Sequence, residues 1–306
     1  MHGPNTVFAV SLAFIALGYL LKRLKVFEEG AGQTLTRVAL YLTLPAVILS
    51  TVPEVPLEAS LLVFPGACLL VGAVAFGVGR RLYNGYDERT RGALLMASVG
   101  YNNGLFAYPI VQAIWGTAGV QYLAVFDLAN VLLLLGVNYL IAAWYGARAA
   151  GRSPEISVGY ILGNLARSVP LLAYALAVLM NLTGLRFPGP AAVLVETAAR
   201  ANMPVVLLLL GVYLELRVPR AELGAAARAL ALRYFLGLAA GAALYVLLPF
   251  DPVFRKVLLV ALILPVGATV TPFAAAFALN HRLAALCANA SLIVSFLLLW
   301  AVVNLL

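Results

Sequence analysis

The sequence has 306 residues, of which 64% are hydrophobic and only 10% are charged, and its net charge is +8. Soluble domains usually carry about 25% charged residues, so this composition excludes a water-soluble globular protein and indicates a lipid bilayer as the surroundings. The positive charge does not indicate a nucleic-acid partner, because the basic residues stand in short runs between apolar segments.

Ten apolar segments are each long enough to cross a bilayer, which takes about 20 residues. In chain order they lie at 5–22, 33–51, 58–80, 91–112, 119–146, 158–182, 189–214, 227–248, 254–279 and 283–305. The sequence therefore predicts an all-α membrane protein with ten transmembrane helices. The first segment is expected to be retained, because no basic region typical of a cleaved signal peptide precedes it.

Lysine and arginine are unevenly distributed over the connections between these segments. Fourteen of them, Arg217 included, lie in or beside the odd-numbered connections, whereas the even-numbered ones hold only Arg186, Arg255 and Lys256. Because basic connections stay in the cytoplasm, this pattern predicts a multi-pass protein of the inner (plasma) membrane with both termini on the extracytoplasmic side.

Proline and glycine recur at a nearly constant spacing in the two halves of the chain. The separation within each pair is nearly the same for Pro45 and Pro204, Gly104 and Gly267, and Pro109 and Pro272. Five helices per half invert the second half relative to the first. The sequence therefore predicts two inverted five-helix repeats, over residues 1–150 and 151–306.

The fourth and ninth predicted helices should each be broken near their middle, since proline and glycine interrupt the runs GYNNGLFAYPIV and LPVGATVTPFA. Unpaired backbone groups cost several kcal/mol each in hydrocarbon, so a break is tolerated only where protein, water or a ligand satisfies them. Broken helices in corresponding positions of two repeats mark the binding site of many transporters. The alternative is a pair of ordinary kinked helices without a ligand.

Polar and helix-breaking residues around the two breaks are the candidate substrate- or ion-binding residues. They are Asn102, Asn103, Gly104 and Pro109 at the first break, and Pro265, Gly267, Thr269, Thr271 and Pro272 at the second. Amides and hydroxyls supply hydrogen bonds, and the positive end of each following half-helix favours an anion by about 0.3–1 kcal/mol. The pattern favours a carboxylate-bearing solute.

Charged residues inside predicted helices are further candidates, because charge is costly at depth. Asp127, with Asn130 and Asn138 near the same helical face, either faces the breaks and carries a coupling Na⁺ or H⁺, or caps a helix near the outer surface. Glu196 and Arg200 either neutralise each other or leave Arg200 for a substrate carboxylate.

Two more arginines lie within the predicted helices. Arg233 is near the start of the eighth helix and is expected to reach the cytoplasmic surface by snorkelling. Arg167 lies about ten residues into the sixth helix, and the sequence assigns it no role.

Four stretches resemble the auxin efflux carrier family. NNGLFAYP has that family's Asn seven residues before a Pro, here Asn102 and Pro109. LPVGATVTPFAAAF resembles its second crossover segment, and YLTLPAVIL resembles its second helix. GNLARSVPLLAYALAVLMNLTG resembles its sixth helix, although Leu165 rather than proline follows Asn164 and the proline is delayed to Pro170.

This resemblance covers essentially the whole chain and implies two inverted five-helix repeats whose fourth and ninth helices cross where they unwind. It implies a scaffold of helices 1, 2, 6 and 7 that forms a homodimer. Helices 3–5 and 8–10 would form a transport domain that moves like an elevator. The implied substrates are small organic anions such as auxin or dicarboxylates, and the compact loops are similar to those of bacterial members.

Other classes of function have less support in the sequence. No Gly-x-Ser-x-Gly or His-Glu-x-x-His motif is present, so neither an enzyme nor a cofactor is expected. A channel would need a continuous polar lining, whereas the polar residues here gather at the breaks. A channel or a non-transporting receptor remains the alternative to a secondary transporter.

Overall fold

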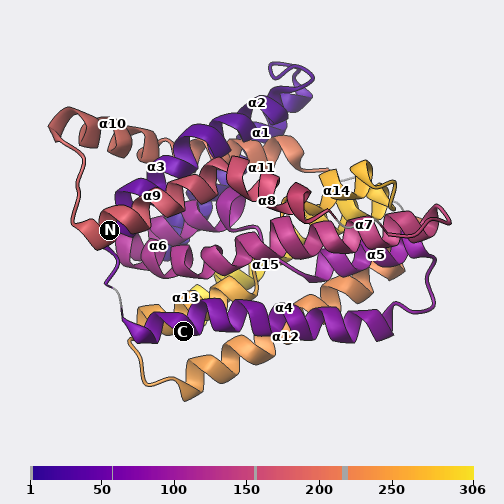
Figure 1. Cartoon of the computed structure of the whole chain (residues 1–306). Coiled ribbons are helices and arrows are strands. Elements are labelled where there is room, and N and C mark those ends of the chain that lie inside the picture. Colours follow the sequence, from indigo (N-terminus) through magenta and orange to yellow (C-terminus); the bar gives the residue numbers. More distant parts are fainter. Residues whose placement is uncertain (1–2, 57, 155–156, 216–219) are drawn as a thin grey trace. The chain divides into compact units, whose positions relative to one another are not determined.

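The computed structural model describes residues 3–56, 58–154, 157–215 and 220–306, and every regular element within these ranges is a helix (Figure 1). The α-helices are α1 (Pro4–Arg23), α2 (Ala31–Val38), α3 (Leu44–Thr51), α4 (Val63–Leu82), α5 (Glu88–Ser98), α6 (Tyr108–Leu132), α7 (Asn138–Ala149), α8 (Val158–Arg167), α9 (Val169–Thr183), α10 (Gly189–Arg200), α11 (Asn202–Tyr213), α12 (Leu223–Leu247), α13 (Pro252–Leu262), α14 (Val270–Ala276) and α15 (His281–Leu305). Short π-helical turns are η1 (Ala39–Thr43), η4 (Asn103–Ala107) and η5 (Leu133–Val137). Short 3₁₀ turns are η2 (Val52–Glu54), η3 (Ala59–Leu62) and η6 (Arg220–Glu222).

Among the described residues, seven helical segments are long and apolar enough to cross a membrane, and the bent pair of α8 and α9 makes an eighth if it is one span. The prediction of one continuous sixth helix is wrong at Ser168. The Ser168 hydroxyl accepts a hydrogen bond from the Leu171 amide and caps α9. Pro170, at the second position of α9, has no amide hydrogen for a continuous helix. Arg217, part of the charge pattern, lies outside the described residues.

The chain divides into two compact units, each built from separate stretches of sequence. Unit 1 comprises residues 1–61, 104–125 and 166–214, and unit 2 comprises residues 62–103, 126–165 and 215–306. The chain therefore passes between the units twice near the fourth and fifth predicted helices.

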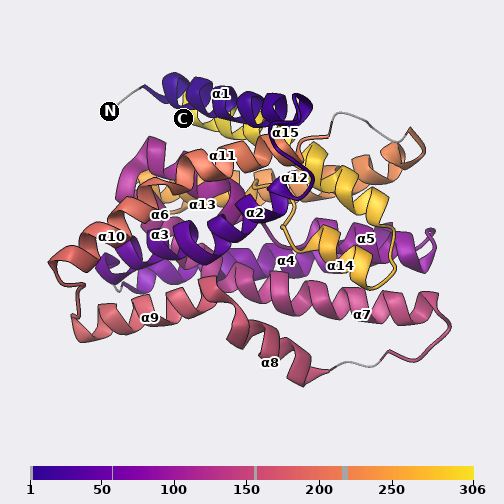
Figure 2. The same cartoon turned by 90° about the horizontal axis from the view of Figure 1, so that it is seen from above.

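Within unit 1, α1 lies beside α11 (Figure 2). Glycine makes this close approach possible, because Gly18 faces the backbone of Leu208 and Gly211 faces the backbone of Ile15. Asn181 of α9 adds polar contacts and donates hydrogen bonds to the carbonyls of Val52, Pro53 and Val55 at 2.9–3.2 Å. This amide satisfies backbone groups where α3 unwinds into η2.

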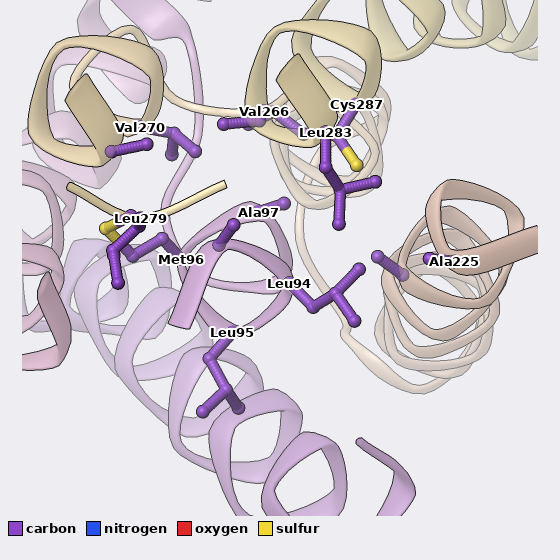
Figure 3. Close-up of a cluster of buried hydrophobic side chains, with 14 of the residues drawn as sticks. Leu94, Leu95, Met96, Ala97, Ala225, Val266, Val270, Leu279, Leu283 and Cys287 are labelled. Carbon is purple, nitrogen blue, oxygen red and sulfur yellow. The ribbon is translucent and has the colours of Figure 1, made fainter. Parts of the chain in front are cut away.

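The core of unit 2 surrounds α5. Leu94, Leu95, Met96 and Ala97 are fully buried and pack among side chains of α7, α12, α14 and α15 (Figure 3). Such a short helix needs this enclosure, because an isolated helix of about 12 residues is marginal in water. The core therefore holds the end of α5 in place, at the start of the first break.

Asp87 begins α5 and accepts hydrogen bonds from the amides of Arg89 and Thr90. Burial acts to raise the pKa of Asp87, but hydrogen bonds from Thr90 and from backbone amides outweigh it and lower the pKa below its ordinary value. Asp251 caps α13 in the same way and accepts from the Phe254 amide at 3.0 Å. Both helices that lead into a break therefore start with a capping aspartate.

Candidate functional site

The first break follows α5, where the chain leaves the helix after Ser98. Val99 is extended, with φ −114° and ψ 138°, and Gly100 has a left-handed φ of 80°. Residues with a side chain rarely adopt that φ, and a Cβ at Gly100 would also lie 2.9 Å from Cδ2 of Leu134. Helical structure resumes at Asn103. Gly100 therefore both permits the break and permits close packing beside it.

The second break follows α13 and extends from Ile263 to Thr269. Two serines of α15 pair with its backbone. The Ser295 hydroxyl donates to the Ile263 carbonyl at 2.7 Å, and the Ser291 hydroxyl accepts from the Val266 amide at 3.0 Å. Both serines are fully buried. Side chains thus replace the hydrogen bonds that a continuous helix would have made.

The two breaks meet in unit 2. Tyr101 and Val266 form an isolated antiparallel bridge, and the Asn102 amide donates to the Pro265 carbonyl at 3.0 Å. Two stretches from opposite halves of the sequence are therefore paired backbone to backbone. Ordinary kinked helices would not exchange such hydrogen bonds.

A cluster of buried amides and one carboxylate holds the first break. Asn130 binds both backbone groups of Tyr101, accepting from its amide and donating to its carbonyl, each at 2.8 Å. Asp127 accepts from the side chains of Asn103 at 2.7 Å and Asn130 at 3.0 Å. All three of these polar side chains are buried. Asp127 therefore faces the break within unit 2.

The same helical face continues past the crossing point. Leu134 packs against both Gly100 and Gly267, so a Cβ on either glycine would collide with it. Asn138 then donates weakly to the Val99 carbonyl at 3.5 Å and to the Thr269 hydroxyl at 3.4 Å. Asp127, Asn130, Leu134 and Asn138 therefore contact successively earlier residues of the first break, and Leu134 and Asn138 also contact the second break.

Two oxygen atoms, one at the first break and one on this helical face, are buried and have no hydrogen-bond partner in the described parts of the chain. The Oδ1 atoms of Asn103 and Asn138 have no hydrogen-bond partner among the described residues, although both side chains are almost fully buried. Leaving such an acceptor unpaired costs about 1–3 kcal/mol. Each oxygen is therefore suited to a cation or to a hydrogen-bond donor brought by a ligand.

Arg233 of α12 joins the ends of both half-helices. Its guanidinium donates to the carbonyls of Leu264 and Pro265 at 2.8–3.0 Å and to the carbonyl of Ala97 at 3.2 Å. It also lies over the Tyr101 ring, 4.6 Å from its centroid. The snorkelling prediction is wrong, because Arg233 is only 3% exposed and its charged group binds buried carbonyls. Its position in the sequence did not reveal these distant acceptors.

Comparison with known proteins shows the family of this chain. A model of the membrane transport protein family, which includes the auxin efflux carriers, matches residues 6–303. The chain belongs to this family. It is 27% identical over 226 residues to an uncharacterized transporter of Methanothermobacter thermautotrophicus, covering 72% of this chain and 70% of the relative. It is 23% identical over 222 residues to an uncharacterized transporter of Methanocaldococcus jannaschii, covering 69% of each.

The remaining predicted site residues of this membrane transport protein occupy different places. Thr271 and Pro272 lie in the first turn of α14 in unit 2. Pro109 is the second residue of α6, and Gly104 lies in the π-helical turn before it. Both residues belong to unit 1, so the structure does not bring them into the compact unit that holds the crossing point.

The charged residues of the sixth and seventh predicted helices belong to unit 1, whereas the crossing point belongs to unit 2. Glu196 and Arg200 form an ion pair at 2.7 Å, and both side chains are exposed. They line a cavity of about 420 Å³ in unit 1. Arg167 is exposed in the last turn of α8, where the negative end of the helix dipole favours a positively charged side chain.

Sequence reasoning missed Tyr101, Arg233, Ser291 and Ser295, although all four support the breaks. Serine is common in membrane helices and carries no distinctive spacing here. Buried arginine is rare at depth, and that signal alone could have marked Arg233 as a candidate.

Proposed function

We propose that the protein is a secondary active transporter of a small organic anion, with the solute bound at the two breaks in unit 2. The observation that supports this most is the backbone pairing of Tyr101 with Val266 in a chain that belongs to a membrane transport family. Non-helical backbone at membrane depth is tolerated where it is enclosed by protein or lines a cavity. Paired broken helices are where secondary transporters bind their solutes.

Arg233 makes this place suitable for an anion. The carboxyl ends of α5 and α13 each carry a partial negative charge of about half an elementary charge. The guanidinium of Arg233 binds carbonyls at both ends and offsets that charge. Asn102 and Thr271, which are half-buried, would then hydrogen-bond the solute. Carboxylates of the auxin or dicarboxylate type fit this chemistry.

Asp127 is the proposed coupling group for Na⁺ or H⁺. Its carboxylate lies next to Asn103, whose unpaired Oδ1 is a second oxygen ligand of the kind that hard cations prefer. Asp127→Asn should retain the fold and make transport insensitive to Na⁺ and to pH, with exposed Glu196→Gln as control. Unchanged ion dependence in Asp127→Asn would rule out this role.

Ten transmembrane helices in two inverted repeats are the proposed architecture. The segment Asn103–Ala149 has 47 residues, about twice the length of one crossing, and is interrupted at Gly116. Two further pairs of residues have matching roles in the two halves. Asp87 and Asp251 cap the helices that lead into the breaks, and Asn130 and Ser291 each accept from a backbone amide of the bridge. Both pairs have nearly the same separation in the sequence as the paired prolines and glycines.

The two compact units support an elevator mechanism. Unit 1 contains α1, α3, α9, α10 and α11, from the first, second, sixth and seventh predicted helices, which we propose as a dimerising scaffold. Unit 2 contains the bridge and is the proposed transport domain. Residues 1–150 and 151–306 would be the repeats, each contributing to both units. The proposed location is the inner (plasma) membrane with both termini extracytoplasmic. Labelling of Gly3→Cys and Asn84→Cys from each side would test the orientation.

Flux into proteoliposomes tests the proposed function. Saturable uptake of a radiolabelled carboxylate, stimulated by the same solute inside, is expected for a carrier, whereas linear non-saturable flux would indicate a channel. No flux of any carboxylate in the panel would favour a receptor. Asn102→Ala should abolish binding with normal expression, and exposed Asn84→Ala is the matched control. Transport by Asn102→Ala at the wild-type rate would place the site elsewhere.

A further inference from the structure

A second cavity lies within unit 2, between α4, α5 and α7, and has a volume of about 440 Å³. None of the residues that pair at the breaks lines it. Three arginines, Arg80, Arg91 and Arg148, surround one part of the cavity together with Glu88. Apolar side chains of α4 and α7 line the rest. The cavity is thus basic in one part and apolar in the other.

The basic part carries an excess of positive charge. Of these three arginines, only Arg148 has a carboxylate partner among the described residues, namely Glu88 at 3.0 Å. Arg91 donates through Nη2 to the Arg80 carbonyl at 2.9 Å and lies over the Tyr145 ring, 5.6 Å from its centroid. Three guanidinium groups against one carboxylate leave a site that favours an anion.

Two buried atoms in this part are unpaired within the described residues. They are Nε of Arg91, a hydrogen-bond donor, and Oε2 of Glu88, an acceptor. An occupant that satisfies both must offer an acceptor, such as a phosphate oxygen, and a donor, such as a hydroxyl. A phosphate group esterified with glycerol has both, because its oxygens accept hydrogen bonds and the free glycerol hydroxyls donate them.

The apolar part follows one face of α7 away from the basic part. Arg148, Trp144 and Ile141 of α7 and Val137 at the end of η5 are spaced three or four residues apart, so they lie along one face over about 16 Å. Trp144 is 44% exposed, as is typical of tryptophan at the membrane interface. The order of polar end, tryptophan and aliphatic side chains matches the order of headgroup, glycerol and acyl chain in a phospholipid.

We propose that this cavity binds one anionic phospholipid with a hydroxyl-bearing headgroup, such as a phosphatidylglycerol. The phosphate would contact Arg80 and Arg91, and a headgroup hydroxyl would donate to Oε2 of Glu88. One acyl chain lies along the face of α7. Basic pockets between transmembrane helices are known to take anionic headgroups. A small soluble anion would leave the apolar half of the cavity uncovered.

Native mass spectrometry and thermal unfolding of the full chain in neutral detergent test this proposal. Added phosphatidylglycerol should be retained at one molecule per chain and raise Tm, and phosphatidylcholine should do neither. Each arginine near an anionic lipid contributes about fivefold in affinity. The double substitution Arg80→Gln with Arg91→Gln should therefore weaken retention by about 30-fold.

A matched control is the double substitution Arg81→Gln with Arg89→Gln, which removes the same charge from exposed positions outside the cavity. It should retain the lipid as the wild type does. Equal loss in both double variants would reduce the effect to general surface charge and overturn the proposal. So would complete competition by glycerol phosphate, because the acyl chain would then add nothing. Should the double variant misfold, exposed Arg80→Gln alone is expected to lose about fivefold.

Discussion

Buried side chains hydrogen-bond the unwound backbone at both breaks, but the two breaks use different side chains. The first, between Ser98 and Asn103, is short and depends on the left-handed Gly100 and on the amide of Asn130. The second, from Ile263 to Thr269, is longer and depends on two buried serine hydroxyls. Unwound backbone can therefore be held by different buried side chains, provided that a neighbouring helix supplies the right donors and acceptors.

Arg233 is the one residue among those described that binds carbonyls at both breaks, so its replacement should have the largest effect. Arg233→Gln leaves the buried carbonyls of Ala97 and Leu264 without the donors that Arg233 supplies, and each costs about 1–3 kcal/mol. We expect loss of folded protein by size-exclusion chromatography in detergent. Arg233→Lys should recover part of the stability, since lysine keeps the charge but not the planar fork.

The control for that substitution is Arg228→Gln, on the same helix. Arg228 is exposed and donates only to the Tyr86 hydroxyl among the hydrogen bonds of the described residues. A wild-type elution profile for Arg233→Gln would show that the half-helix ends do not need the charge.

Asn130 and Ser291 support the two breaks to different extents. Asn130 makes three hydrogen bonds at the first break, whereas Ser291 accepts one from the second. Asn130→Ala should lower the free energy of unfolding by about 2–4 kcal/mol and Ser291→Ala by about 1–2 kcal/mol. Thermal unfolding of the two variants side by side measures the difference. Equal losses would mean that the two breaks are supported to the same extent.

Alanine substitutions at Gly100 and Gly267 distinguish the cost of backbone strain from the cost of steric crowding. Alanine at either position collides with Leu134, but only Gly100 of the two has a positive φ. Gly100→Ala should cost about 1–2 kcal/mol more than Gly267→Ala, because of the left-handed backbone. Adding Leu134→Ala should rescue Gly267→Ala in Tm, and rescue Gly100→Ala only in part. Full rescue of both would make crowding the whole effect.

The smallest effects are expected at the two capping aspartates. Asp87→Ala and Asp251→Ala should each lower stability by about 1 kcal/mol. Because the pKa of folded Asp87 is lowered, its contribution is present above the unfolded pKa, near 4, and is lost as pH falls through the folded pKa. The Tm difference between wild type and Asp87→Ala should therefore shrink on acidification. A constant difference down to pH 2 would contradict this assignment.

The sequence by itself determined the class of protein, the family and the approximate places of the two breaks. Hydrophobic length alone identifies membrane helices, because a bilayer requires about 20 apolar residues for each crossing. Proline and glycine likewise mark weak points in a helix through local geometry. Asn102, Asn103 and Gly267 were therefore placed at the breaks without any knowledge of the fold.

Only the tertiary structure decided what holds those breaks. Arg233 is distant in the chain from both Leu264 and Ala97, yet it binds both carbonyls. Ser291 and Ser295 look like ordinary serines of a membrane helix until the second break is seen beside them. The reason is physical: a hydrogen bond depends on where two groups lie in space, and local sequence records only one of the two.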